Sequence, residues 1–251
     1  EEIQLGGRRH GHRRDAQAIS HHYDVSNRFY EWVLGPTMAY TCAVFPAADA
    51  DLEHAQATKF DLVCRKLDLK PGMRLLDVGC GWGGMARHAA AEYGVDVVAV
   101  TLSEQQARWG ARLIEAEGLT SQVQIRHSDY RHVPEVGFDA VSSIGLTEHI
   151  GKRNYPSYFS FLRSKLKGAG RLLNHCITRT DTKQRHYMRR GFINRYVFPD
   201  GELLHVGHLI EQMEEQSLEV QHEENLRQHY AQTLAFWSAN LEEHWRDAVA
   251  E

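Results

Sequence analysis

Residues 75–84 read Leu-Leu-Asp-Val-Gly-Cys-Gly-Trp-Gly-Gly and could form a ligand-binding turn. An apolar run ends at Asp77, and a helix-like segment begins at Met85, directly after the glycines. Glycine lets the backbone approach a ligand closely, and the N-terminus of a helix offers unpaired N–H groups. A strand that ends in such a turn predicts a nucleotide-type pocket rather than a plain connection.

The glycine spacing alone does not decide which nucleotide binds. Gly79, Gly81 and Gly84 satisfy the G-x-G-x-x-G pattern of dinucleotide folds. Dinucleotide sites also use an acid at the end of the next strand, but the strand expected at 95–101 has its acid, Asp96, near its start. The order Asp-x-Gly-x-Gly is instead the one that S-adenosylmethionine (SAM) methyltransferases use, with the glycines under the methionine part of SAM.

Composition limits the class of protein. The 251 residues suffice for one large domain, or one domain and an arm, and the net charge of −4 gives no support for a nucleic-acid partner. The four cysteines form no C-x-x-C pair, which favours a reduced, cytoplasmic protein and no metal site. No apolar run approaches the roughly 20 residues that span a bilayer. Any membrane contact is therefore expected to be peripheral.

Histidines gather near the N-terminus at His10, His12, His21 and His22. A metal site is one interpretation, but no carboxylate or cysteine joins them at ligand spacing. We favour a polar, basic terminus that touches anionic lipid head groups weakly.

Strand and helix patterns alternate after Pro71-Gly72. Strands are expected at 73–78, 95–101, 122–127, 138–144 and 170–178, with helices at 84–93, 103–117 and 155–167. A helix from Asp51 to about Leu67 is expected before them; after them we expect helices at 205–215 and 229–246 and a strand near 217–225. Such alternation predicts an α/β fold, a mostly parallel sheet with helices on both faces.

The same patterns divide the chain into an arm and one domain. We expect an arm or linker remnant at 1–18, a helical cap at 19–70, a SAM-binding core at 71–178, an insertion over the pocket at 179–204 and a C-terminal part at 205–251. Together the last four make up the methyltransferase domain at 19–251.

Motifs outside the glycine turn narrow the interpretation. They are His22–Tyr30, Met38–Phe45, Leu76–Gly83, Val100–Gln106, Ser143–Gly151, Asn174–Thr178, Tyr196–Gly201 and His229–Leu234. Together they resemble the cyclopropane fatty acid synthase family, which includes the mycolic acid methyltransferases, over about residues 20–246. The resemblance implies a Rossmann-like SAM-dependent methyltransferase that acts on a cis double bond of a lipid acyl chain.

The resemblance also implies which residues surround SAM. They are Tyr40, Thr41, Asp77, Gly79, Cys80, Gly81, Thr101, Leu102, Gln106 and Ile144. Asp129 and Tyr130 follow the third expected strand, where the adenine is usually flanked. The strand ending Thr101-Leu102-Ser103 also matches the family, which lacks the usual ribose acid there, and this removes the objection raised by the dinucleotide pattern.

The family binds a bicarbonate ion as its base, and five positions match that site. They are Cys42, Glu148, His175, Ile177 and Tyr230, with Cys42 and Ile177 acting through backbone groups. When an alkene attacks the sulfonium methyl, a carbocation results, and a proton must leave before the ring closes. A small anion avoids a side-chain base that could be methylated or trap the cation, and Glu148 beside an anion needs a proton or a donor partner.

Aromatic faces can stabilise a cation. The candidates are Tyr23, Phe29, Tyr30, Tyr40 and Phe198. Trp82 could cover SAM or simply pack.

Several alternatives remain open at this point. The product could be a cyclopropane, a methylene branch or a methyl branch, and the acyl chain could belong to a phospholipid or to an acyl carrier protein. A small-molecule O- or N-methyltransferase and a non-catalytic binding protein are the competing classes. We expect a cytoplasmic protein peripheral to the inner face of the membrane, with a homodimer as one option. Because the family continues past Glu251 with a helix and a strand, we also expect the natural protein to be longer.

Overall fold

The computed structural model describes residues 7, 10–11, 14–15, 17, 26–180 and 200–251. Its centre is a five-stranded sheet in the order β3-β2-β1-β4-β5, in which every neighbouring pair is parallel. The strands are β1 (Arg74–Val78), β2 (Asp96–Thr101), β3 (Val123–His127), β4 (Phe138–Ile144) and β5 (Leu166–His175). The predicted α/β fold with a parallel sheet is confirmed.

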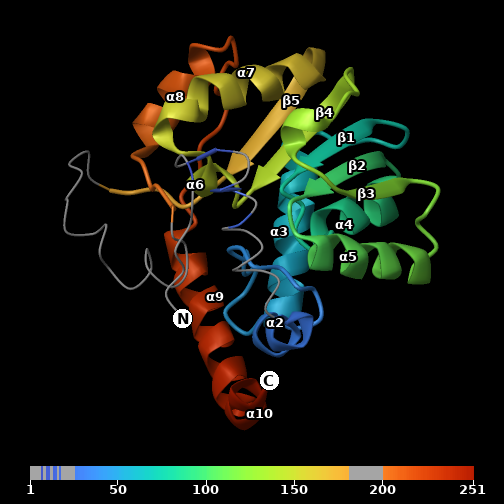
Figure 1. Cartoon of the computed structure of the whole chain (residues 1–251), viewed down its shortest axis with the longest axis vertical. Helices are drawn as coiled ribbons and strands as arrows, with labels where there is room; N and C mark the ends of the chain where they lie inside the picture. The colour runs from blue at the N-terminus through green and yellow to red at the C-terminus, as the bar shows by residue number, and fades with distance from the viewer. Residues whose placement is uncertain (1–6, 8–9, 12–13, 16, 18–25, 181–199) are drawn as a thin grey trace.

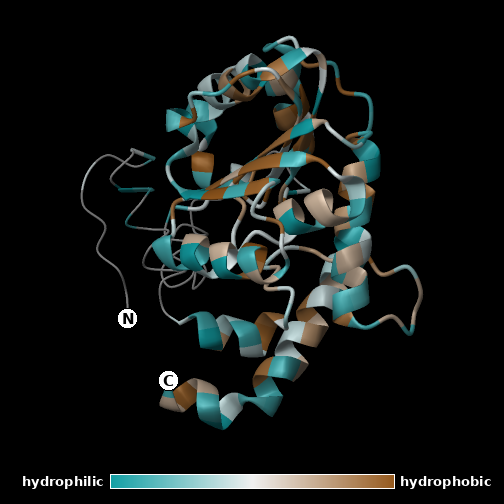
Figure 2. Ribbon diagram, turned by 90° about the vertical axis from the view of Figure 1, so that its right-hand side faces the viewer, coloured by the Kyte–Doolittle hydropathy of each residue, from teal (hydrophilic) through white to brown (hydrophobic). Residues whose placement is uncertain are grey.

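Helices cover both faces of this sheet (Figure 1). One face carries α3 (Leu52–Lys66), α4 (Gly84–Tyr93) and α5 (Glu104–Ala116), and the other carries α7 (Tyr155–Lys165) and α8 (Val206–Glu214). The remaining helices are α2 (Asn27–Leu34), the short α6 (Thr147–Ile150), α9 (Arg227–Glu243) and α10 (Trp245–Ala250). Hydrophobic strands run through the middle of the ribbon, as a parallel sheet buried on both faces requires (Figure 2).

Short polar residues start two of the helices that position the site. The Asp51 carboxylate accepts a hydrogen bond from the N–H of His54, 2.8 Å away, at the start of α3. The Ser103 hydroxyl accepts one from the N–H of Gln106, 3.1 Å away, at the start of α5. Both contacts satisfy N–H groups that a helix leaves unpaired in its first turn.

A third hydrophobic cluster lies beside the sheet and ties α9 to the N-terminal part of the domain. It joins Tyr30 and Leu34 of α2 to Trp82 of the glycine turn and Trp237 of α9. Asn240 of α9 adds a hydrogen bond to the carbonyl of Val33, 3.0 Å away. These contacts hold α9 next to elements that precede the sheet and that are far from α9 in the sequence.

Three predicted elements differ in the structure. The strand expected near 217–225 is wrong: residues 218–226 are irregular, because only Leu218 and Val220 alternate before a run of exposed polar residues. Strand β5 begins and ends earlier than 170–178, and the helix expected at 229–246 is two helices, α9 and α10.

The N-terminal arm also differs from expectation at one described position. His10 is 7% exposed rather than solvated, and its ring occupies the space that a Cβ on Gly151 would need. The other three N-terminal histidines, Tyr23, Phe198 and most of the expected insertion at 179–204 lie outside the described residues. No helix in the described ranges is both long and apolar enough to cross a membrane.

Candidate active site

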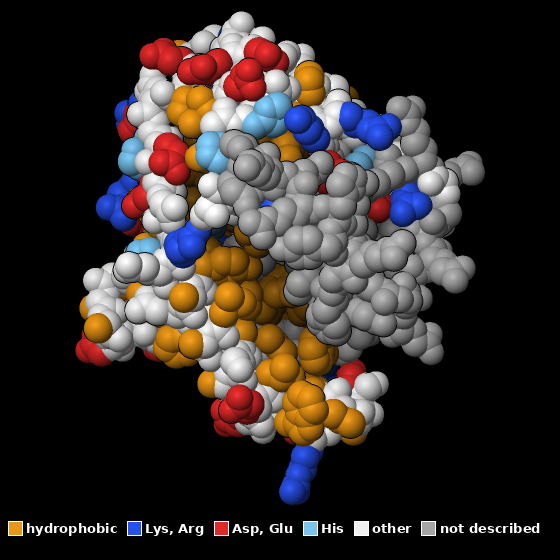
Figure 3. Space-filling model, turned by 90° about the vertical axis from the view of Figure 1, so that its left-hand side faces the viewer, with side chains coloured by type: hydrophobic (Ala, Val, Ile, Leu, Met, Phe, Trp, Pro, Cys, Tyr) orange, Lys and Arg blue, Asp and Glu red, His pale blue; other side chains and the backbone are white. Residues whose placement is uncertain are grey.

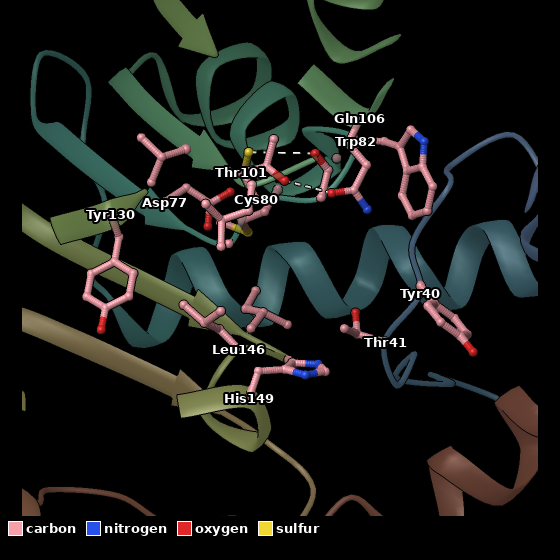
Figure 4. Close-up of a pocket in the computed structure, with 18 of the residues that line it drawn as sticks. Tyr40, Thr41, Asp77, Cys80, Trp82, Thr101, Gln106, Tyr130, Leu146 and His149 are labelled. Atoms are coloured by element: carbon pink, nitrogen blue, oxygen red, sulfur yellow. Dashed lines mark hydrogen bonds between the residues drawn. The ribbon is translucent and has the colours of Figure 1, made fainter. Parts of the chain in front are cut away.

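A pocket opens at the carboxyl ends of β1, β2 and β4 (Figure 4). We call it the sheet-edge pocket; it lies where the strand order reverses, which is where open α/β sheets bind ligands. Its walls include all but one of the residues expected around SAM: Tyr40, Thr41, Asp77, Gly79, Cys80, Gly81, Thr101, Leu102, Gln106, Tyr130 and Ile144. Tyr40 and Tyr130 lie at opposite ends of it.

The glycine turn forms the floor of the pocket. Gly79, Gly81 and Gly83 have φ values of 76°, 55° and 83°, a region that residues with a Cβ rarely adopt. A Cβ on Gly79 would lie 3.2 Å from the Cβ of Leu146. The N–H groups of Gly79 and Cys80 both donate to the carbonyl of Val100, so β2 fixes the turn in place.

Asp77 ends up buried beneath this turn, with 2% of its surface exposed. Its Oδ1 accepts a hydrogen bond from the Ser142 hydroxyl, 2.7 Å away, and its Oδ2 has no partner among the described residues. Burial raises the pKa of this carboxyl to about 6, although Ser142 and the nearby Lys59 oppose the shift. An unsatisfied buried oxygen at a pocket wall is suited to a ligand that brings a donor.

The end of β2 carries a hydroxyl and an amide in place of an acid. The Thr101 hydroxyl donates to Oε1 of Gln106, 2.7 Å away, and both side chains are buried. Asp129 is the exception among the expected cofactor residues: it does not line the pocket, because its carboxylate accepts three hydrogen bonds from Arg131, at 2.5 to 2.9 Å.

The loop at 38–43 forms the opposite wall and is held from behind by α3. The Gln56 amide donates to the carbonyls of Ala39 and Thr41, at 3.2 and 3.0 Å. The Lys59 ammonium group donates to the Thr41 hydroxyl, 2.9 Å away. These contacts fix the loop that carries Tyr40 into the pocket and Cys42 away from it.

Glu148 lies beside the pocket at the start of the short helix after β4. It is 9% exposed, and its Oε1 accepts a hydrogen bond from the N–H of Ile177, 2.7 Å away. Its Oε2 has no partner within the described part of the chain. Burial raises the pKa of Glu148 to about 7, although the bond from Ile177 opposes the shift. The carboxyl group is therefore about half protonated at pH 7 and mostly protonated below it, and its protonated form can donate a hydrogen bond.

Tyr230 and Cys42 complete what we call the Glu148 cluster (Cys42, Glu148, Ile177 and Tyr230). Burial, together with Tyr40, Glu148 and Cys42 nearby, raises the pKa of Tyr230 to about 12. Burial likewise raises the pKa of Cys42 to about 11. Near neutral pH the cluster thus contains a phenol, a thiol and a carboxyl group that is partly protonated.

His175 ends β5 beside Ile144, the last residue of β4. Burial lowers its pKa to about 4, and Lys59 and Lys66 lower it further. The imidazole is neutral at pH 7 and a weak base. The structure thus brings His175 to the same edge of the sheet, and its carbonyl accepts a hydrogen bond from Gly145, 2.8 Å away.

Aromatic rings connect the pocket with the cluster. The Trp237 ring lies 5.2 Å from that of Tyr40 and 6.2 Å from that of Tyr230, measured between centroids. Tyr30 packs against both Tyr40 and Trp82, so the indole of Trp82 is part of this packing as well as of the pocket wall. The aromatic candidates that the structure describes therefore form one contiguous group.

Sequence reasoning missed Gln56, Lys59 and His149, all of which border the site. Gln56 and Lys59 fall at helical spacing with Leu52 and Val63, so polar side chains on the buried face of α3 were the signal. His149 lines the pocket, and burial together with His10 lowers its pKa to about 4.

A parallel sheet with a glycine turn after β1 and a pocket at the strand ends is typical of SAM-dependent methyltransferases, and the comparisons place the chain in this class. Within this class, the chain belongs to the mycolic acid cyclopropane synthetase family, whose model matches residues 10–251. The resemblance predicted from the motifs is confirmed.

Individual relatives agree with this membership. A probable fatty acid methyltransferase of Mycobacterium tuberculosis is 62% identical over 242 residues, 96% of this chain and 56% of that protein. The cyclopropane-fatty-acyl-phospholipid synthase of Escherichia coli is 39% identical over 216 residues, 86% of this chain and 54% of that protein. The chain spans about half the length of these curated relatives.

A solved structure gives the same result in three dimensions. Mycolic acid cyclopropane synthase CmaA1 complexed with SAH and CTAB is 35% identical, with a TM-score of 0.87 over 94% of this chain and 86% of that chain.

The residues present fit SAM. Three glycines with positive φ leave room for close backbone approach, the free Oδ2 of Asp77 can accept from an ammonium group, and apolar side chains make up much of the remaining wall. The Glu148 cluster also fits a small anion, because its protonated carboxyl and phenol are donors.

Proposed function

We propose that this chain methylates a cis double bond in a lipid acyl chain and closes a cyclopropane ring, with a phospholipid as the carrier. SAM supplies an electrophilic methyl group when bound. Bicarbonate, when held by Glu148, His175 and Tyr230, supplies a base that is a poor nucleophile. The names of the relatives support a lipid substrate, and the Glu148 cluster supports a reaction through a carbocation.

The burial of Cys42 and Glu148, together with an Oε2 of Glu148 that has no partner among the described residues, is the observation that carries this proposal. A thiolate or a phenolate beside a carbocation would trap it, but burial keeps Cys42 and Tyr230 protonated. Glu148 takes part in its protonated form, and its Oε2, which no described residue pairs, can then donate to an anion. His175 is neutral near pH 7 and can donate a hydrogen bond to the anion.

An apolar surface beside the cluster supports an acyl substrate. Hydrophobic side chains line part of a hollow on one face of the molecule (Figure 3). Ile177 and Leu234 are 38% and 48% exposed, although both are large and apolar. Apolar side chains that gather on one face can mark a binding surface, and an acyl chain is a chemically suitable occupant.

Mass analysis of acyl chains after incubation with labelled SAM and vesicles of cis-unsaturated phospholipid tests the proposal. We expect a gain of one CH₂ with loss of the double bond, and no change in vesicles of saturated lipid. A gain of one CH₂ with the alkene retained would instead indicate a methylene branch. Label that appears only on an acyl chain carried by acyl carrier protein would show that this protein, and not a phospholipid, is the carrier. No acyl product, with label on a small amine or hydroxyl, would contradict the proposal.

A methyl-branching fatty acid methyltransferase is the second candidate. It is favoured by the relative that is 62% identical, which is called a probable fatty acid methyltransferase. Both candidates use the same pocket and the same cluster, and they differ in where the proton is lost. The mass experiment therefore separates them, because a saturated methyl branch also requires a reductant.

A further inference from the structure

Lys59 is a buried lysine in the wall of the sheet-edge pocket. Its side chain is 2% exposed, and its Nζ donates to the Thr41 hydroxyl at 2.9 Å and lies 3.9 Å from the centre of the Phe60 ring. No carboxylate lies at ion-pair distance within the described part of the chain. Buried lysines without an ionic partner are uncommon, because the charged form loses its hydration.

Titratable groups face Lys59 from four directions. They are Asp77 on β1, Cys42 on the 38–43 loop, His175 at the end of β5 and His88 on α4. Of these four groups only Asp77 can carry a negative charge near neutral pH. Burial keeps Cys42 a thiol and lowers the pKa of both histidines, so these three groups are uncharged there. Burial lowers the pKa of Lys59 to about 7, so its charged and neutral forms are both populated near neutral pH.

We propose that Lys59 makes the pocket sensitive to the net charge of its occupant. The pocket accepts SAM, which has a net positive charge, when the amine of Lys59 is neutral, and it accepts the net-neutral product S-adenosylhomocysteine (SAH) while Lys59 keeps its ammonium form. The inference rests on the proposed use of SAM. It assigns Lys59 as a positioning and specificity-determining residue.

The physical argument is a comparison of the two ligands. SAM and SAH share the adenosine and the amino-acid part, and differ by one methyl group and one positive charge at sulfur. Two positive charges in one poorly hydrated cavity repel each other. SAM binding therefore expels the extra proton of Lys59 to solvent, whereas SAH binding does not.

The hydrogen bond to Thr41 lets this proton leave without disturbing the pocket wall. A neutral amine keeps two N–H groups, so Nζ can continue to donate to the Thr41 hydroxyl. Gln56 holds the loop backbone independently. After methyl transfer the occupant is neutral and Lys59 can regain its proton, so the exchange of SAH for SAM becomes less favourable as the pH falls.

Calorimetry on the unmodified protein tests this directly. At pH 7, in two buffers with different ionisation enthalpies, we expect SAM binding to release about half a proton more than SAH binding, because a group with a pKa near 7 is half protonated. Equal proton release for the two ligands would overturn the inference and leave the proposed function standing. Failure of SAH alone to bind would overturn the inference, and failure of SAM to bind would overturn both.

Variants give a second measurement. From pH 8 to pH 6 the affinity for SAM relative to SAH should fall about tenfold in the unmodified protein, since a pKa near 7 makes the neutral form about ten times scarcer. Lys59→Met should remove most of this pH-dependent loss of relative SAM affinity, and only the part caused by titration of Asp77 should remain.

Two further variants complete the set. Lys59→Arg, which stays charged, should weaken SAM binding at every pH and spare SAH. Lys70→Met, at an exposed lysine beyond the end of α3, is the matched control. A full pH dependence retained in Lys59→Met would overturn the inference, and the calorimetry decides it if that variant does not fold.

Discussion

The sheet-edge pocket and the Glu148 cluster are neighbours, but they are built in different ways. Much of the pocket comes from short turns that directly follow β1 and β2, and backbone groups of those turns fix its shape. The cluster takes Cys42, Glu148, Ile177 and Tyr230 from four distant segments. A cofactor site can thus be built by local backbone geometry, whereas control of protonation states needs burial that the whole fold supplies.

Glu148→Leu is expected to separate the two regions most strongly. An apolar side chain cannot donate to the anion, so the bound base is lost and turnover should fall by about a thousandfold, within the range for acid–base groups. Binding of SAM, measured by calorimetry, should change less than twofold. Glu115→Leu, at an exposed position on α5, is the control. Unchanged turnover would remove Glu148 from the chemistry.

The pH dependence of stability should also set the cluster apart. The folded protein holds a proton on Glu148 up to about pH 7, whereas the unfolded chain releases it near 4.5, so this group lowers the free energy of unfolding as the pH rises between those values. The loss is about 3 kcal/mol when complete. Chemical denaturation of Glu148→Gln should show a stability gain over the unmodified protein that grows from pH 4.5 to pH 7.5. A constant difference would mean that the carboxyl group is not protonated in the folded state.

Thr233→Val probes the long-range connection of the cluster. The Thr233 hydroxyl accepts from the N–H of Ala43, 3.0 Å away, and donates to the carbonyl of His229, 2.7 Å away. Loss of the acceptor leaves a buried N–H unpaired, so the free energy of unfolding should fall by about 1–3 kcal/mol. Turnover should fall while SAM affinity is kept.

The matched control is Thr58→Val, because Thr58 donates to His54 in the same way on an exposed face. An equal effect of the two substitutions in denaturant titrations would show that the Ala43 contact contributes nothing.

Gly79→Ala should affect the sheet-edge pocket and not the Glu148 cluster, and we expect the smallest effect from this substitution. Its φ of 76° strains an L-residue by about 1–2 kcal/mol, and the new Cβ would crowd Leu146. We expect SAM affinity to weaken about tenfold, with turnover at saturating SAM largely retained. Gly72→Ala carries the same strain in open space away from the pocket, so it should lower stability without changing the affinity.

The sequence predicted the pocket better than the cluster, for the same structural reason. Gly79, Thr101 and Gln106 stand next to the strands that place them, so local patterns suffice. The sequence placed Asp129 beside the cofactor, but its carboxylate bonds to Arg131 in the η1 turn (Tyr130–His132). The position of Asp129 after the third strand does not by itself reveal this contact.

Residues that act through burial were harder to find. Lys59 and Gln56 carry ordinary surface side chains, and only their place on the buried face of α3 reveals them. The Glu148 cluster was predicted by resemblance alone, since no spacing in the chain relates position 42 to position 230. The irregular 218–226 segment was missed because two alternating residues are too short a pattern to decide a strand.

The hydrogen bond between Ala43 and Thr233 has a consequence for how the protein matures. It joins residues 190 positions apart, so the chain must close a very long loop before the bond can form. Strands β1 and β2 with α4, in contrast, need only neighbouring residues. We expect amide hydrogen exchange to show α9 opening more readily than the sheet. A nascent chain should then be able to hold its methyl donor well before it is able to use it.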